Sequence, residues 1–441
     1  MRLDSDYWKK KYRRFFKCFD RLNCTPITEQ AIIQDGNHMS IGEHFTDVGI
    51  PYFRGTDMRN FFIDVDATPL CIPQSVYQSS YLKRSHLLPS DVLISIVGTI
   101  GNVAMVTRNQ EATCNCKLAI LRANNQLRPE YIAAFFACKY GQWQIERNIR
   151  GSIQKGLILE DFEQLTIPVI DAEEQFKVAK IVERSRYALT TAISLYSSAE
   201  NYLLECLGMQ DFAANPGAYS VKTLKESFLE SGRIDAEFYL PKYEDYVNAV
   251  LAYAGGVAPL GDVCAIKDSN YTPEHGEKYR YIELANIGKS GEIMGCTCEK
   301  GEELPTRARR IVTQGDVIVS SIEGSLSSCA LVTEDYDHAL CSTGFYVVRS
   351  AHINSETLLT LFKSFPVQQL LKKGCSGTIL TGISKQEFEG IPIPLIRHEV
   401  QEEIAKQIRQ SFTLRKEAAE LLENAKLSVE HVIENGGGIN G

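Results

Sequence analysis

The sequence predicts a mixed α/β (α+β) protein that is built twice along one chain. Residues 151–175 (GSIQKGLILEDFEQLTIPVIDAEEQ) and 377–401 (GTILTGISKQEFEGIPIPLIRHEVQ) agree at 10 of 25 positions without a gap. In each copy, β-rich runs separated by Gly, Asn, Asp and Pro give way to amphipathic helices, and a long helix closes the copy. We therefore expect two tandem domains related by pseudo-twofold symmetry, each followed by a long helix, with the two helices pairing as an antiparallel coiled coil.

The repeat includes two further blocks in the same order. RLDSDYWKKKY from Arg2 matches RIDAEFYLPKY from Arg233, and PSDVLIS from Pro89 matches QGDVIVS from Gln314. Three blocks at nearly one offset indicate the tandem duplication of a unit of about 200 residues, a period too long for a solenoid. The predicted boundaries are 1–170 for the first domain, 171–210 for the central helix, 211–396 for the second domain, 397–434 for the C-terminal helix and 435–441 for a flexible tail.

The two long helices carry matching apolar positions at alternating steps of four and three residues, the seam of a coiled coil. Asp171 is placed to cap the first helix, with Glu174 three residues later, whereas Arg397 stands where the second helix should have its cap. A helix of roughly 36 residues would be about 54 Å long, too long to bury its stripe in the preceding domain. The alternative is that each helix packs on its own domain or on another chain. The seam consists of Val178, Val182, Leu189, Tyr196 and Leu203 in the first helix and Ile404, Ile408, Leu422 and Val429 in the second, with interruptions at Ser185, Ser411 and Arg415.

The composition limits the compartments and metal sites that we expect. There is no run of about 18 uncharged apolar residues, which argues against a membrane span, and the charged N-terminus lacks the apolar core of a signal peptide. We expect a cytoplasmic protein whose 13 cysteines are reduced thiols. The CxC pairs Cys114/Cys116 and Cys296/Cys298 could each share a metal, but no further ligand stands at a suitable spacing. We interpret them as small packing residues and predict no metal site.

The net charge of -8 hides a difference between two parts of the chain. Residues 1–160 hold 20 Lys and Arg against 15 Asp and Glu, whereas residues 161–441 hold 27 against 40. A basic stretch is compatible with nucleic-acid binding but is weak evidence for it, because a solvated helix face has the same composition.

Sequence motifs of the common catalytic sites are absent. No lysine has an acidic residue two positions before it, as in many metal-dependent nucleases, and there is no NPPY-like or DPPY-like adenine-methylation motif. GKS at 288–290 resembles the end of a P-loop, but Glu283 occupies the position of its leading glycine. GxSxG and HExxH are also absent. We therefore expect a recognition protein without a catalytic residue.

Polar glycine-rich turns occur at corresponding places in the two copies. GTIGN at 98–102 corresponds to EGSLSS at 323–328, and GSIQKG from Gly151 corresponds to SGTILTG from Ser376. Glycine lets the backbone approach a phosphate closely while a neighbouring Ser or Thr hydroxyl donates to it. These turns are candidates for backbone contacts to nucleic acid, although ordinary tight turns have the same composition.

Together these features resemble the specificity (S) subunits of type I restriction-modification systems. The pattern is G-S/T-x-x-x-G-I/L, then a segment ending I-P-x-I/P, then E-x-Q at the start of a long helix, once mid-chain and once near the C-terminus. The R-L/I-D-x-D/E-Y/F-W/Y opening, the D-V-L/I-I/V-S run and the GTIG turn extend the resemblance over essentially the whole chain. It implies two target recognition domains, each reading one half of a split double-stranded DNA sequence, and two helices that set the gap between the halves.

The resemblance also implies partner subunits. Two modification (M) methyltransferase subunits would dock on the helices, bring S-adenosylmethionine and methylate adenine after flipping it from the duplex. Restriction (R) subunits would add ATP-driven translocation and the nuclease. The chain itself would then bind no cofactor, and S-adenosylmethionine, ATP and Mg would belong to the partners. The alternatives are a specificity subunit of a type II system with a fused methyltransferase-nuclease, and a coiled-coil adaptor that binds protein instead of DNA.

Candidate DNA contacts follow from the polar loops and the basic runs. Arg favours guanine and Gln favours adenine in the major groove, while Ser, Thr and Lys more often contact phosphates. Residues 218–397 hold 18 basic and 23 acidic residues, so the second DNA surface is expected to be a local patch around RARR at 307–310. The predicted contacts are Arg54, Thr56, Arg59, Thr99, Ser152, Gln154 and Lys155 in the first domain, and Asn286, Lys289, Arg307, Arg309, Arg310, Ser325, Thr378 and Thr381 in the second.

Overall fold

The chain forms two compact units. In the computed structural model, the first unit comprises Met1–Thr191 and Leu414–Gly441, and the second comprises Ala192–Thr413. The long helices α6 (Ala172–Cys206) and α12 (His398–Glu434) each contribute one part to the first unit and the other part to the second. The mixture of helix and sheet and the long C-terminal helix confirm the predicted fold class. The structure describes Lys9, Tyr12 and residues 17–58, 60–65, 69–124, 126–151, 155–377 and 381–435.

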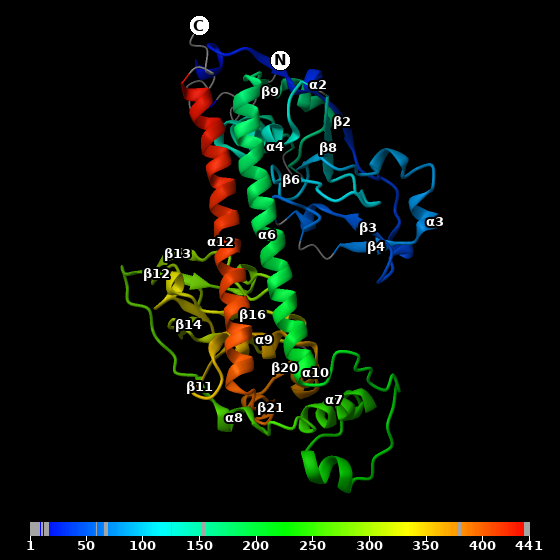
Figure 1. Ribbon diagram of the computed structural model, residues 1–441, viewed down its shortest axis with the longest axis vertical. Helices are drawn as coiled ribbons and strands as arrows, with labels where there is room; N and C mark the ends of the chain where they lie inside the picture. Colours follow the sequence, from blue (N-terminus) through cyan, green and yellow to red (C-terminus); the bar gives the residue numbers. More distant parts are fainter. Residues whose placement is uncertain are drawn as a thin grey trace. The chain divides into compact units, whose positions relative to one another are not determined.

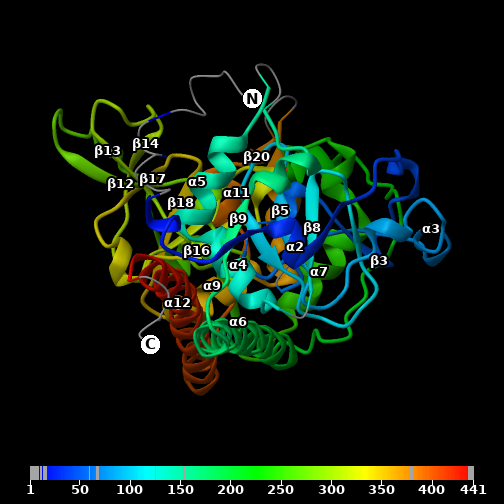
Figure 2. The same cartoon turned by 90° about the horizontal axis from the view of Figure 1, so that it is seen from above.

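The first unit is an α+β domain built on two sheets. Its elements before α6 are β1 (Cys24–Pro26), α2 (Ile27–Gln30), β2 (Ala31–Asp35), β3 (Ile50–Phe53), β4 (Leu70–Ile72), α3 (Gln74–Tyr77), β5 (Val92–Ser95), β6 (Val103–Met105), β7 (Thr113–Cys114), β8 (Leu118–Ala123), α4 (Pro129–Ala137), α5 (Lys139–Asn148) and β9 (Thr166–Pro168). The larger sheet is antiparallel in the order β2-β8-β5-β6, and the smaller sheet has the order β4-β3-β7 with β3 and β7 parallel. Figure 1 labels β2, β8 and β6 of the larger sheet and β3 and β4 of the smaller one. Helix α4 packs on β5, β6 and β8 (Figure 2 labels α4, β5 and β8). Strand β1 pairs with β9 just before α6.

The second unit repeats this topology. Its elements before α12 are α7 (Pro241–Leu251), β10 (Val257–Pro259), α8 (Leu260–Val263), β11 (Cys264–Lys267), β12 (Lys278–Ile282), β13 (Thr297–Lys300), β14 (Ala308–Ile311), β15 (Val317–Ser320), β16 (Cys329–Leu331), β17 (Leu340–Ser342), β18 (Phe345–Ser350), α9 (Ser355–Lys363), α10 (Phe365–Gly374), β19 (Cys375–Ser376), β20 (Gly382–Ile383), α11 (Lys385–Glu389) and β21 (Pro392–Pro394). The sheet β11-β18-β15-β16 corresponds to β2-β8-β5-β6, and β13-β12-β17 corresponds to β4-β3-β7 with β14 added at the edge. The pair β10 and β21 corresponds to β1 and β9.

A buried carboxylate directly precedes β5 in the larger sheet of the first unit, and another directly precedes β15 in that of the second unit. Asp91 is 1% exposed and accepts hydrogen bonds from Nε and Nη2 of Arg122 at 2.8 and 2.7 Å. Asp316 is fully buried and contacts Nε of Arg349 at 2.8 Å and Nζ of Lys267 at 2.7 Å. A carboxylate that leaves water needs such partners to remain ionised at an acceptable cost. This requirement accounts for the aspartate that opens the repeated D-V-L/I-I/V-S block.

In the first unit, α6 and α12 lie in contact and run antiparallel. The Ser185 hydroxyl donates to the backbone carbonyl of Ala418 at 2.8 Å. Val178, which precedes Ser185 in α6, lines one groove with Leu427, which follows Ala418 in α12. Residue numbers therefore increase along α6 in the direction in which they decrease along α12. The antiparallel pairing expected from the sequence is thus present in this unit (Figure 1).

In the second unit, the same pairing recurs with the roles of the helices exchanged. The Ser411 hydroxyl donates to the carbonyl of Ala192 at 2.7 Å, and Asn201 of α6 lines one groove with Glu403 of α12. The serines that interrupt the apolar pattern therefore lie inside the seam, where a small side chain allows close helix contact. Among the predicted seam positions, Val178, Val182, Tyr196, Leu203, Ile404, Ile408 and Val429 are buried, whereas Leu189 and Leu422 are half-buried.

The starts of the long helices are fixed by polar side chains. Asp171 accepts the backbone N–H three residues later at 2.8 Å, which confirms the predicted cap. The side-chain carbonyl of Gln175 accepts the backbone N–H of Arg128 at 2.8 Å, and Gln401 accepts that of Asn354 at 2.7 Å. The repeated E-x-Q block therefore binds each long helix to the loop before α4 or α9.

The two buried carboxylates differ in their number of cations, which predicts unequal losses of stability. Arg122→Met leaves Asp91 without a cation among the described residues, and should lower the free energy of unfolding by about 3 kcal/mol. Arg349→Met leaves Asp316 with Lys267, and should cost only about 1 kcal/mol. Urea denaturation followed by circular dichroism compares the two matched variants. Equal losses would contradict this account of the carboxylates.

Candidate nucleic-acid interface

In the first unit, the two glycine-rich turns lie side by side. The backbone N–H of Leu157 donates to the carbonyl of Ile96 at 2.9 Å, and Gly156 forms a β-bridge with Val97. The turn at 98–102 thus adjoins Gly156 and Leu157 at the end of the second turn. The sequence had shown that both turns recur in the second copy, but not that they are neighbours in the fold.

The first turn holds its own shape and leaves its tip exposed. Gly98 and Gly101 have φ of +85° and +92°, a conformation that favours glycine. The backbone N–H of Asn102 donates to the Ser95 hydroxyl at 2.9 Å, and that hydroxyl donates to the carbonyl of Thr99. Because the turn is braced from inside, the exposed Thr99 side chain and the turn backbone remain accessible to a ligand.

Arg54 lies beside this surface on a short 3-10 turn, η2 (Gly55–Asp57), that follows β3. A Cβ built on Gly55 would lie 3.8 Å from the Val97 carbonyl oxygen, so η2 adjoins the glycine-rich turn. Nε and Nη2 of Arg54 bind the two carboxylate oxygens of Asp57, each at 3.1 Å, and this hydrogen bonding raises the pKa of the guanidinium. Of the other predicted contacts, Thr56 and Lys155 are exposed on the same group of loops, whereas Arg59, Ser152 and Gln154 lie outside the described residues.

The second unit brings the corresponding turns together in the same way. The backbone N–H of Glu323 donates to the carbonyl of Thr381 at 3.0 Å, and that of Ile383 donates to Ser321 at 2.9 Å. The Ser325 hydroxyl lies 2.8 Å from that of Ser320 within the turn. Both Ser325 and Thr381 are half-buried, and Thr378 lies outside the described residues.

The position of Arg54 is occupied by a residue of opposite charge in the second unit. Glu283 follows β12 and directly precedes the 3-10 turn η7 (Leu284–Asn286). Asn286 accepts the backbone N–H of Glu283 at 2.9 Å, as Asp57 accepts that of Arg54 at 2.8 Å. Asn286 therefore corresponds to the capping residue of the first turn. Sequence reasoning missed Glu283, although an alignment of YFRGTD with YIELAN would have found it.

The three arginines of the RARR run have different environments. Arg307 is exposed and lies 3.7 Å from the Glu283 carboxylate. Arg309 donates from Nε to the Thr306 carbonyl at 2.7 Å. Arg310 donates from Nη1 to the Phe345 carbonyl at 2.9 Å, and its Nε is enclosed by protein. Arg310 is thus bound to β18 of the neighbouring sheet, and Arg307 is the most exposed arginine of the run. Lys289, on a neighbouring turn, is also exposed.

The described residues give no indication of a metal centre or a membrane span. Within the ranges that the structure describes, no group of three His, Cys, Asp or Glu side chains is arranged to hold a metal ion. The Sγ atoms of Cys296 and Cys298 lie 4.0 Å apart, and both cysteines are free thiols. None of the helices in this part of the chain combines the length and apolarity needed to cross a bilayer.

Comparison with protein families identifies the class of this fold. Residues 31–194 and 256–424 each match the family described as type I restriction modification DNA specificity domain. The two matches cover most of the chain and fall on the two sequence repeats. The chain therefore belongs to this family and carries its domain twice, which confirms the resemblance seen in the sequence.

The chain also has low similarity to solved structures. The chain is 13% identical to the type I restriction-modification system S subunit from M. genitalium, with a TM-score of 0.42, and 94% of this chain and 96% of that chain are covered. It is 14% identical to the HsdS subunit from Thermoanaerobacter tengcongensis, with a TM-score of 0.30 and coverages of 94% and 97%. A comparison with curated proteins found no match.

The environments of the cations predict different effects of their removal on DNA binding. Lys155→Ala and Arg307→Ala each remove an exposed charge, so each should weaken binding to any duplex and lower the slope of log K against log salt by about 0.9. Arg310→Ala should leave that slope unchanged and lower the melting temperature, because its guanidinium joins β14 to β18 of the neighbouring sheet. Fluorescence titrations at several salt concentrations measure the slopes. Unaltered slopes for Lys155→Ala and Arg307→Ala would exclude both residues from the interface.

Proposed function

We propose that this chain is the DNA sequence-specificity subunit of a type I restriction-modification complex and that it binds a bipartite DNA target. The observation that carries the proposal is the duplicated domain: each unit places two glycine-rich turns and a short 3-10 turn at corresponding sites. Two similar surfaces on one chain suit a target with two separate halves. The family membership supports DNA as the ligand.

Each surface offers groups for both phosphate and base contacts. Exposed turn backbone, Thr99 and Lys155 suit phosphate oxygens in the first unit. Arg54 is oriented by Asp57, and an arginine so held is suited to the O6 and N7 acceptors of guanine. Glu283, at the corresponding place in the second unit, would accept a hydrogen bond from the N4 amino group of cytosine. The two units would thus read different half-sites.

The proposal assigns the reactions to partner subunits. The chain would dock two modification (M) subunits, which supply S-adenosylmethionine and the methyltransferase site, and restriction (R) subunits, which supply ATP hydrolysis, Mg and the nuclease. In the first unit, the long helices expose the apolar side chains Phe176, Tyr187 and Leu427, and Tyr187 is 72% exposed. Exposed apolar side chains on a helix pair support a protein partner at this surface. Within the complex the chain would act in the cytoplasm as a non-catalytic subunit.

Two other functions share part of this support. A specificity subunit of a type II system would use the same surfaces with a fused methyltransferase-nuclease as its partner. A coiled-coil adaptor that binds protein would use the helices alone. The glycine-rich surfaces present in both units favour a DNA-binding function over the adaptor.

Co-expression with a modification subunit of the same restriction-modification system tests the proposed function. Methylome sequencing of the host should then show methyladenine in one new bipartite motif whose two halves differ in sequence. The purified chain alone should neither transfer methyl groups nor cut duplex DNA. Methylation without a bipartite motif, or catalysis by the isolated chain, would contradict the proposal.

A further inference from the structure

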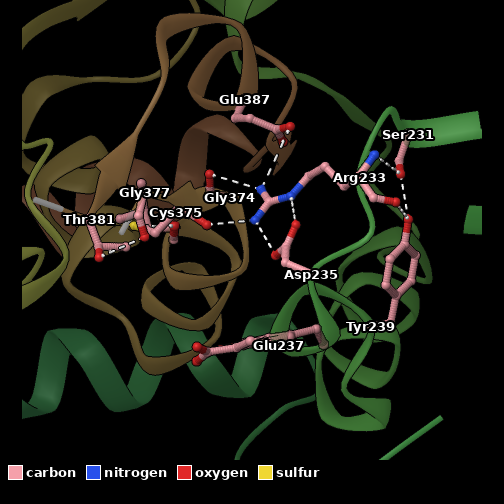
Figure 3. Close-up of polar contacts among 12 residues, drawn as sticks. Ser231, Arg233, Asp235, Glu237, Tyr239, Gly374, Cys375, Gly377, Thr381 and Glu387 are labelled. Carbon is pink, nitrogen blue, oxygen red and sulfur yellow. Dashed lines mark hydrogen bonds and ion pairs between the residues drawn. The ribbon is translucent and has the colours of Figure 1, made fainter. Parts of the chain in front are cut away.

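The repeated block RIDAEFY forms a polar clamp in the second unit (Figure 3). The guanidinium of Arg233 donates from Nη1 to the Gly374 carbonyl at 3.3 Å and from Nη2 to the Cys375 carbonyl at 2.7 Å. It also binds the Asp235 carboxylate through Nε at 2.9 Å and Nη2 at 2.6 Å. The Arg233 side chain is only 11% exposed. The earlier copy of this block, from Arg2, lies outside the described residues.

The carbonyls that Arg233 binds mark the point where α10 ends and β19 begins. Arginine is favoured there because the carbonyls at the end of a helix carry partial negative charge. Cys375 pairs with Ile383 across the short ladder of β19 and β20. The backbone N–H of Ile383 in turn donates to the carbonyl of Ser321. Ser321 lies at the base of the glycine-rich turn whose backbone donates to the carbonyl of Thr381. Arg233 therefore fixes the base of the hairpin that carries Thr381 at the candidate DNA surface.

Other residues of the block hold Arg233 in place. The Phe238 ring lies 4.3 Å from the guanidinium carbon, and the Tyr239 hydroxyl donates to the Arg233 carbonyl at 2.9 Å. Hydrogen bonding between Arg233 and Asp235 raises the pKa of the guanidinium and lowers that of the carboxyl. Glu387 approaches the guanidinium at 3.9 Å. The charged forms of both clamp partners are thus stabilised.

The segment around the clamp contributes little to the hydrophobic core. None of the residues 211–240 is fully buried, and Tyr219, Val221 and Ile234 are largely exposed. Loss of the clamp would therefore open no cavity in the core. Its removal should act on the hairpin and leave the rest of the unit folded. A positioning function follows more directly from these contacts than a contribution to global stability.

We propose that Arg233 is a positioning residue for base discrimination by the second unit, because it orients the β19–β20 hairpin against the neighbouring turn at 322–325. This inference rests on the proposed function and assigns a role in that function to the repeated block. The planar guanidinium reaches two carbonyls and a carboxylate at once, a geometry that a lysine ammonium does not reproduce. Arg233→Lys should therefore fail to replace Arg233 although it keeps the charge.

The test uses the specificity subunit assembled with its methyltransferase partner and DNA in which each half-site is scrambled in turn. Arg233→Ala and Arg233→Lys should each lose at least about tenfold of the discrimination at one half-site and keep that at the other. Hydrogen exchange of the peptide spanning β19 and β20 should accelerate in both variants. The melting temperature should fall only slightly, because the segment around the clamp contributes no buried residue to the core. Asp235→Asn, which alters a half-exposed partner of the clamp, should give a smaller loss at the same half-site.

Lys222→Ala is the matched control, because it removes a paired cation from the same segment whose partner, Glu244, lies in α7 and not in the hairpin. It should retain discrimination at both half-sites. Rescue by Arg233→Lys would show that Arg233 contributes only charge, and equal loss at both half-sites with a markedly lower melting temperature would show a general folding role. Either result overturns the inference. If the unaltered complex discriminates at neither half-site, the proposed function fails instead.

Discussion

The contact on which the rest of the architecture depends is the hydrogen bond from a buried serine to the backbone of the opposite long helix. Ser185 makes it in the first unit and Ser411 in the second, each to an alanine carbonyl. A larger side chain at either place would hold the helices apart. Gln175 and Gln401 then attach the long helices to the domains, because their side chains accept backbone hydrogen bonds from the loops before α4 and α9. The loops at the candidate interface are attached to the sheets that these helices support.

The duplication has preserved the scaffold more closely than the surface. The buried carboxylates Asp91 and Asp316 keep an arginine partner in both units. The side chain of Gln142 donates to a carbonyl at the end of α4, and Gln368 donates to the corresponding carbonyl at the end of α9. By contrast, the residue that opens the 3-10 turn changes from arginine to glutamate. The contacts repeated in both units therefore hold equivalent backbone structure, whereas the charge of the residue before the 3-10 turn differs between the units.

Sequence reasoning predicted the duplication, the long helices and the cap at Asp171, because these features depend on local spacing. It also selected turns that the fold brings together, since each occurs at the same place in both copies. It treated Arg307, Arg309 and Arg310 as one patch, although successive side chains of a strand point to opposite faces and the register of β14 shifts between Ala308 and Arg310. The enclosure of Arg310 depends on the distant β18, which no local pattern reveals.

The spacing of apolar residues along the long helices also could not distinguish the buried positions of the seam from the half-exposed positions beside them. Leu189 and Leu422 share the spacing of the buried positions but lie half-exposed, while the two serines that break the pattern are fully buried. A coiled-coil pattern describes which side chains share a face, and the depth of each depends on the shape of the partner. Likewise, the RIDAEFY block was visible as a repeat, but its role depends on carbonyls more than a hundred residues later in the chain.

In the turns at 54–57 and 283–286, the last residue maintains the backbone conformation, and the first residue differs in charge between the two units. The closing hydrogen bond runs from a main-chain amide to Asp57 or Asn286, so it is independent of the side chain at position 54 or 283. An acidic, basic or neutral side chain can therefore occupy that position while the loop keeps its conformation. Under the proposed function, such a site would allow a protein of this class to read a different base after replacement of one residue, without rebuilding the domain.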